Sequence, residues 1–90
     1  MNSIKMFAHG TEERNNLEKA AEILTAQNEY GRKYHVGETY YDFGQRWMWT
    51  TIMYESEDWG SVQALCPRDQ ELIVEGNIEE GVRNTLKGWC

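Results

Sequence analysis

Residues 46–60 read RWMWTTIMYESEDWG and hold three of the four tryptophans of the chain. In an extended strand, successive side chains point to opposite faces. Trp47, Trp49 and Met53 then lie on one face, and Met48 and Ile52 on the other. A strand that is apolar on both faces is typical of a central strand covered on both sides. We favour this interpretation over the alternative, in which one face is an exposed aromatic patch that binds a partner.

The residues around this stretch predict a small antiparallel sheet, because they show a period of two and many β-branched and aromatic residues. Strands are expected at 34–43 and 46–54, joined by a two-residue turn at Gly44-Gln45, and at 61–66 and 71–75, separated by a turn that begins at Pro67. These four strands form a meander. Residues 3–9 also alternate and are either a fifth strand or an extended arm.

The N-terminal half contains one predicted helix. Thr11 is a suitable cap, and the apolar residues recur at helical spacing at Leu17, Ala20, Ala21 and Leu24. Gly31 is a natural stop for this helix. Arg14 and Glu18 are spaced to form an ion pair on an exposed face.

A second helix is predicted at the C-terminal end. Asn77 and Glu80 have the spacing of a capping box, and Ile78, Val82 and Leu86 recur every four residues. Gly81 costs this helix about 1 kcal/mol relative to alanine, so the helix depends on docking against the rest of the chain. The predicted fold is therefore α+β: one domain, residues 1–90, in which the sheet packs with an N-terminal-half helix and this C-terminal helix.

Targeting and redox signals are few. No apolar run reaches the ~20 residues of a membrane span, and the N-terminus lacks the pattern of a secretory signal, so a cytoplasmic location is the default expectation. Cys66 and Cys90 are too few for a disulfide scaffold, and both are interpreted as free thiols, although Cys90 could oxidise with Cys66 or with another molecule.

The charge is concentrated in the middle of the chain. The net charge is −6, and residues 38–80 alone hold ten acidic and two basic side chains. Such a surface repels phosphate backbones and attracts cationic partners. Direct binding of nucleic acid is therefore disfavoured.

No residue pattern indicates catalysis or a cofactor. A dyad of Cys66 with His9 or His35 is disfavoured, because no helix is expected to begin after Cys66 and activate its thiol. The histidines and cysteines lack the short-spaced pairs of a zinc site, and residues 55–59 lack the glycine and terminal glutamate of a calcium loop. We expect no enzymatic activity, no metal and no cofactor.

The function favoured by these features is a non-catalytic module that binds a protein with a basic surface. The expected contact residues are carboxylates at turns and strand edges, with one tryptophan beside them: Glu55, Glu57, Asp58, Trp59, Asp69, Glu71 and Glu75. These carboxylates would occupy the arginines and lysines with which a nucleic-acid-binding protein contacts phosphates. Small acidic phage and mobile-element inhibitors of host defence or transcription are similar in size and charge alone. The alternative without any specific binding is an acidic surface that only keeps the protein soluble.

A second interpretation is a self-associating accessory subunit, such as a homodimer, in which the aromatic strand or the terminal helix with Trp89 forms the interface. Aromatic residues and methionine are enriched at the centres of interfaces. This interpretation predicts an exposed apolar patch that contains Trp47 and Trp49, or Trp59 and Trp89. A small enzyme with an unmarked site is the third and least supported interpretation.

Overall fold

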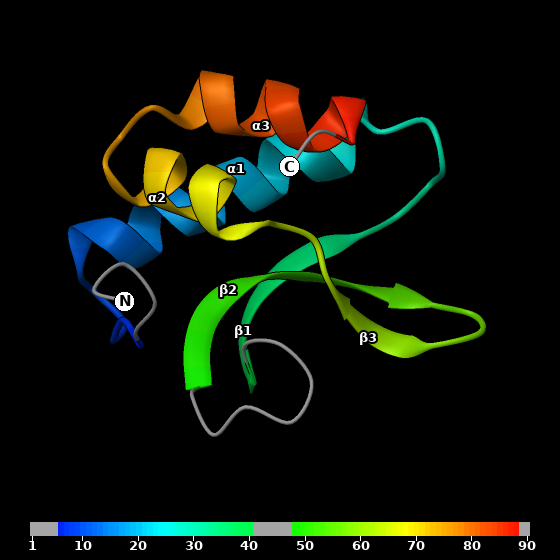
Figure 1. Cartoon of the computed structure of the whole chain (residues 1–90), viewed down its shortest axis with the longest axis horizontal. Helices are drawn as coiled ribbons and strands as arrows, with labels where there is room; N and C mark the ends of the chain where they lie inside the picture. Colours follow the sequence, from blue (N-terminus) through cyan, green and yellow to red (C-terminus); the bar gives the residue numbers. More distant parts are fainter. Residues whose placement is uncertain (1–5, 41–47, 89–90) are drawn as a thin grey trace.

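The computed structural model describes residues 6–40 and 48–88. In chain order the elements are α1 (Glu12–Gln27), β1 (Tyr34–Tyr40), β2 (Met48–Ser56), β3 (Gly60–Gln63), α2 (Pro67–Val74) and α3 (Ile78–Lys87). The strands form one antiparallel sheet in the order β1-β2-β3. Figure 1 shows the three helices on the same side of this sheet. The α+β class is confirmed, but the described residues form three strands, and the expected four or five are not found.

β2 is the central strand of the sheet. It pairs with β1 from Tyr34↔Tyr54 to Tyr40↔Met48, and with β3 from Met53↔Gln63 to Ser56↔Gly60. All five residues from Trp49 to Met53 are buried, so both faces of the strand are covered there as expected. The predicted Gly44-Gln45 turn and Trp47 lie outside the described residues.

The predicted strand at 71–75 is wrong, because residues 67–74 form α2. Pro67 occupies the start of this helix, where its missing N–H costs nothing and its fixed φ suits the first turn. Gln70 and Ile73, three residues apart, are both fully buried on the inner face of α2. The predicted strand at 61–66 is also shorter than expected and ends at Gln63.

A side chain from α2 bonds to β2 where β3 no longer pairs with it. β3 pairs with β2 only up to Met53, and Ala64 adds one further bond to the Ile52 carbonyl at 2.9 Å. Beyond that point the Gln70 amide nitrogen donates to the Thr50 carbonyl at 2.6 Å. The side-chain amide oxygen of Gln70 accepts from the Thr51 hydroxyl at 2.9 Å. The amide of Gln70 therefore satisfies one backbone carbonyl and one side-chain hydroxyl of β2 beyond the end of β3.

The described part of the predicted segment 3–9 forms no strand. Phe7 is buried, and its N–H donates to the Thr50 hydroxyl at 2.9 Å. Arg14 donates to the Phe7 carbonyl at 3.1 Å and to Glu38 at 2.8 Å. Arg14 is therefore only 8% exposed and joins three segments of the chain. Its expected pair with Glu18 is present at 3.6 Å, but the arginine is not on an exposed face.

α1 begins as predicted and ends earlier. The Thr11 hydroxyl accepts from the Arg14 N–H at 3.2 Å, which is the expected cap. The helix ends at Gln27, not at Gly31, because the Asn28 side chain donates to the Leu24 carbonyl at 2.7 Å and accepts from the Arg32 N–H at 2.9 Å. The chain thus turns from α1 towards β1 around one asparagine.

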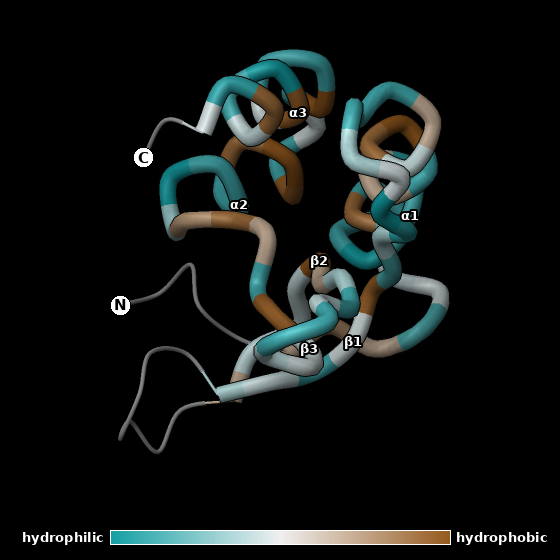
Figure 2. The backbone as a smooth tube through the Cα atoms, turned by 90° about the vertical axis from the view of Figure 1, so that its right-hand side faces the viewer, coloured by the Kyte–Doolittle hydropathy of each residue, from teal (hydrophilic) through white to brown (hydrophobic). Residues whose placement is uncertain are grey.

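α3 packs closely against α2. A Cβ on Gly81 would lie 2.5 Å from Ile73 Cγ1, so the absence of a side chain lets the two helices approach. The helix begins at Ile78 as predicted, but the Asn77 side chain makes no capping bond. The core lies between the helices and the sheet, where Figure 2 shows hydrophobic segments of the helices gathered above the strands. Its buried members are Phe7, Leu17, Ala20, Ala21, Leu24, Ile52, Leu65, Ile73 and Val82.

Candidate functional site

The turn between β2 and β3 is held by a serine side chain. The Ser56 hydroxyl accepts the N–H groups of Asp58 and Trp59, both at 3.3 Å. Gly60 has a φ of 72°, a conformation that glycine adopts at low cost, and it pairs with Ser56 to restart the ladder. These local bonds fix the backbone of residues 57–59.

The same turn presents an aromatic ring beside several carboxylates. Trp59 is 82% exposed. Glu55, Glu57 and Asp58 are exposed as well, and the Ser61 hydroxyl donates to the Glu55 carboxylate. We call Glu55, Glu57, Asp58 and Trp59 the acidic turn. Four of the seven contact residues predicted from sequence therefore share one short exposed hairpin.

Trp49 has the opposite environment. It is completely buried, and its indole N–H donates to the Gln63 side-chain oxygen at 2.7 Å. Trp49 is therefore a core residue and cannot be the exposed interface residue that self-association through the aromatic strand required. Trp47 and Trp89, also named in that interpretation, lie outside the described residues.

The three remaining predicted contact residues lie on α2 or directly after it. Glu71 and Glu75 are exposed. Asp69 is only 1% exposed, and it accepts bonds from the Cys66 thiol and the Asn84 amide, each at 3.3 Å. Asp69 is therefore part of the interior and has no surface to offer a partner. Figure 1 shows α2 far from the β2–β3 turn, so the expected single acidic rim is divided into two separate places.

Cys66 occupies a position that the sequence analysis did not predict. It is the residue before the first turn of α2, so a helix does begin after it. Its thiol donates to the Asp69 carboxylate within the same helix start. His9 lies in the turn before α1, and His35 in β1. Among the described residues, no group of three or more histidine, cysteine or acidic side chains is arranged to hold a metal ion.

Several basic side chains are engaged within the chain. Arg14 binds Glu38, and Arg68 lies 3.6 Å from the buried Asp69 carboxylate. Arg32 stacks over the rings of Tyr30 and Tyr54, at 4.5 and 4.3 Å from the ring centres. These arginines stabilise local structure. None of the ion pairs among the described residues includes a carboxylate of the acidic turn.

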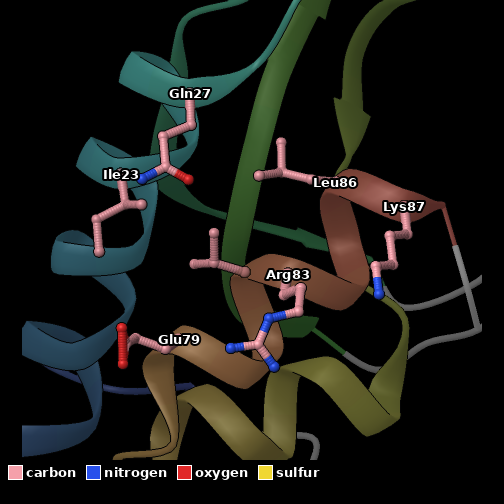
Figure 3. Close-up of a pocket in the computed structure, with 7 residues that line it drawn as sticks. Ile23, Gln27, Glu79, Arg83, Leu86 and Lys87 are labelled. Atoms are coloured by element: carbon pink, nitrogen blue, oxygen red, sulfur yellow. The ribbon is translucent and has the colours of Figure 1, made fainter.

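A groove between α1 and α3 was not predicted from the sequence. It has a volume of about 420 Å³ and is shown in Figure 3. Ile23 and Gln27 of α1 form one wall, while Arg83 and Leu86 of α3 form the other. The spacing of Val82 and Leu86 indicated an apolar face on α3, but only the tertiary structure shows that part of that face stays open.

Comparisons with protein families, with curated proteins and with solved structures give no match to this chain. In the part of the chain that the structure describes, no helix has the length and apolar character to cross a membrane.

Proposed function

We propose that this protein is a non-catalytic binding module whose acidic turn engages a basic surface on another protein. The observation that carries the proposal is Trp59, 82% exposed on a turn that Ser56 holds in place. A large apolar ring gains free energy when a partner removes it from water. Tryptophan is also among the residues that most often dominate binding free energies at interfaces.

The carboxylates define the kind of partner. Glu55, Glu57 and Asp58 are exposed on the same turn as Trp59 and give that turn negative charge, so a matching surface has arginines or lysines beside an apolar depression. Lysine and arginine side chains also stack favourably on tryptophan faces. A protein that uses such a surface to contact nucleic-acid phosphates fits this description, and the module would inhibit or regulate it by occupying those cations, as phage and mobile-element inhibitors do.

The experiment compares two lysine variants with the same change in net charge. In the turn variant, Glu55, Glu57 and Asp58 are replaced by lysine. In the control variant, Glu22, Glu29 and Glu80, which are exposed and lie outside the predicted contact residues, are replaced by lysine instead. Both variants and the wild type are immobilised, exposed to lysate of the source cells, and the captured proteins are identified by mass spectrometry.

The proposal predicts a basic protein that the wild type and the control variant capture and the turn variant does not. Its capture should weaken strongly as salt rises to about 0.15 M, where the Debye length is about 8 Å. If the turn variant captures the same proteins as the wild type, the carboxylates of the turn serve only solubility and the proposal fails.

A further inference from the structure

The groove between α1 and α3 is a second surface with a defined chemical character. Leu86 is 39% exposed, and Ile23 faces the groove from α1. Val82, which is only 3% exposed, also lines the groove. The floor is therefore apolar and open to solvent, and burying it under another apolar group would be favourable.

The rim of the groove is mainly cationic. Arg83 lies on the exposed side of α3, and its side chain has no hydrogen bond or ion pair with another residue that the structure describes. Lys87 follows one turn later on the same wall. Glu79 lies one turn before Arg83 and is the one carboxylate of the lining. A ligand that fits these features has a large apolar side chain next to a carboxylate.

The acidic turn of this same chain has that chemistry, since Glu57 and Asp58 directly precede Trp59. Figure 1 shows the β2–β3 turn away from α3, so the two surfaces of one molecule are not in contact. We propose that the acidic turn of one copy inserts Trp59 into the α1–α3 groove of a second copy, with a turn carboxylate beside Arg83. The contact is heterologous, because two different surfaces meet.

The contact is small. A tryptophan ring buries about 150–250 Å², whereas stable interfaces bury 1,200 Å² or more in total. The self-association is therefore weak and concentration-dependent. The inference rests on the proposed function in one respect, that the acidic turn is a binding element, and a basic partner would compete with the second copy for it.

The test uses two variants that each lose one surface. Trp59→Ala removes the apolar anchor of the turn, and the double variant Arg83→Glu, Leu86→Ser alters the groove. All three side chains are exposed, so circular dichroism should match the wild type. Sedimentation is measured at about 0.15 M salt, where the long-range repulsion between acidic copies is screened.

The wild type should associate as concentration rises, and each variant alone should associate about tenfold more weakly or worse. An equimolar mixture of the two variants should form a dimer and stop there, because it contains one intact turn and one intact groove per pair. A wild type that stays monomeric at millimolar concentration, or a mixture that stays monomeric while both variants are folded, overturns the inference.

The failure of this inference is distinguishable from that of the proposed function. If the wild type is monomeric but the lysine turn variant loses its basic partner, only the groove inference fails. If the mixture dimerises while the lysine turn variant captures the same basic proteins as the wild type, the proposed function fails and the second copy is the ligand of the turn.

Discussion

Gln70 and Thr51 are joined by a buried hydrogen bond of 2.9 Å between the amide oxygen and the hydroxyl. Both side chains are completely buried, and the same amide also donates to the Thr50 carbonyl at 2.6 Å. One glutamine on a helix therefore bonds a backbone carbonyl of the central strand. β3 does not extend that far, so this carbonyl is satisfied by a side chain and not by a neighbouring strand.

Gln70→Ala should lower the free energy of unfolding by about 2–4 kcal/mol, because it leaves two buried polar groups without partners and opens a cavity. Glu71→Ala, at the exposed neighbouring position, is the control and should change stability by about 0.5 kcal/mol or less. Urea unfolding of both variants measures the difference. Equal stability of the two variants would show that the edge of β2 is satisfied in another way.

Gly81→Ala should destabilise the protein although alanine is the better helix former. The new Cβ would lie 2.5 Å from Ile73 Cγ1, and overpacking of this kind costs about 1–3 kcal/mol against a helix-propensity gain of about 1 kcal/mol. In an Ile73→Ala background the two isoleucine atoms at 2.5 and 3.0 Å are absent and only the Asp69 carbonyl oxygen at 3.2 Å stays close, so the same Gly81→Ala change should cost much less or become favourable. A double-mutant cycle by thermal unfolding checks this coupling, and purely additive effects would exclude it.

The ion pair between Arg14 and Glu38 predicts a pH dependence of stability. The Arg14 hydrogen bond holds the pKa of Glu38 below its ordinary value. A depressed folded-state pKa adds stability above the ordinary glutamate pKa of about 4.3, and this contribution is lost as the pH falls through the folded-state value. Glu38→Gln should therefore be less stable than the wild type at pH 7, with a gap that narrows below about pH 4. A gap that is the same at every pH would mean that the charge of Glu38 contributes nothing.

Trp49→Ala should lower the free energy of unfolding by about 3–5 kcal/mol, because a completely buried ring and its bond to Gln63 are lost. Trp59→Ala is the natural comparison, since that ring is exposed and should contribute about 0.5 kcal/mol or less to the fold. Guanidinium unfolding of both variants tests this difference. If the two variants were equally stable, Trp49 would not be a core residue.

Local patterns predicted the elements whose signal is long or repeated. The helical spacing of Leu17, Ala20 and Leu24 predicted α1, and all three residues are buried. The segment 46–54, which is apolar on both faces, predicted a central strand, and β2 is central. In both elements, the spacing of the apolar residues along the sequence indicates which residues are buried.

The prediction of a strand where α2 forms was wrong for a physical reason. The segment 71–75 is a short apolar run, which fits a strand or one face of a helix equally well. Pro67 was interpreted as a turn residue, although a proline at the first helical position is equally typical. Tertiary contacts favour the helix over the strand: Gln70 bonds to β2, and Gly81 of α3 leaves room for Ile73. Neither contact has a local signature.

The candidate site was predictable only in part. The carboxylates and Trp59 at residues 55–59 were identified because they are contiguous and fall between two strands. Asp69 was assigned to the surface because charged residues usually lie there, but its partners Cys66 and Asn84 hold it inside. The groove is formed by Ile23 and Leu86, which are far apart in the chain, so periodicity alone could not place them together.

The most direct test of the account is a calorimetric titration of the basic protein captured by the wild type into wild type and Trp59→Ala. Trp59 is the exposed aromatic residue of the acidic turn, so we predict that the alanine variant binds about tenfold more weakly or worse, with an unchanged melting temperature. Equal affinity for the two proteins would contradict the central claim that the exposed ring of the β2–β3 turn is what a partner binds.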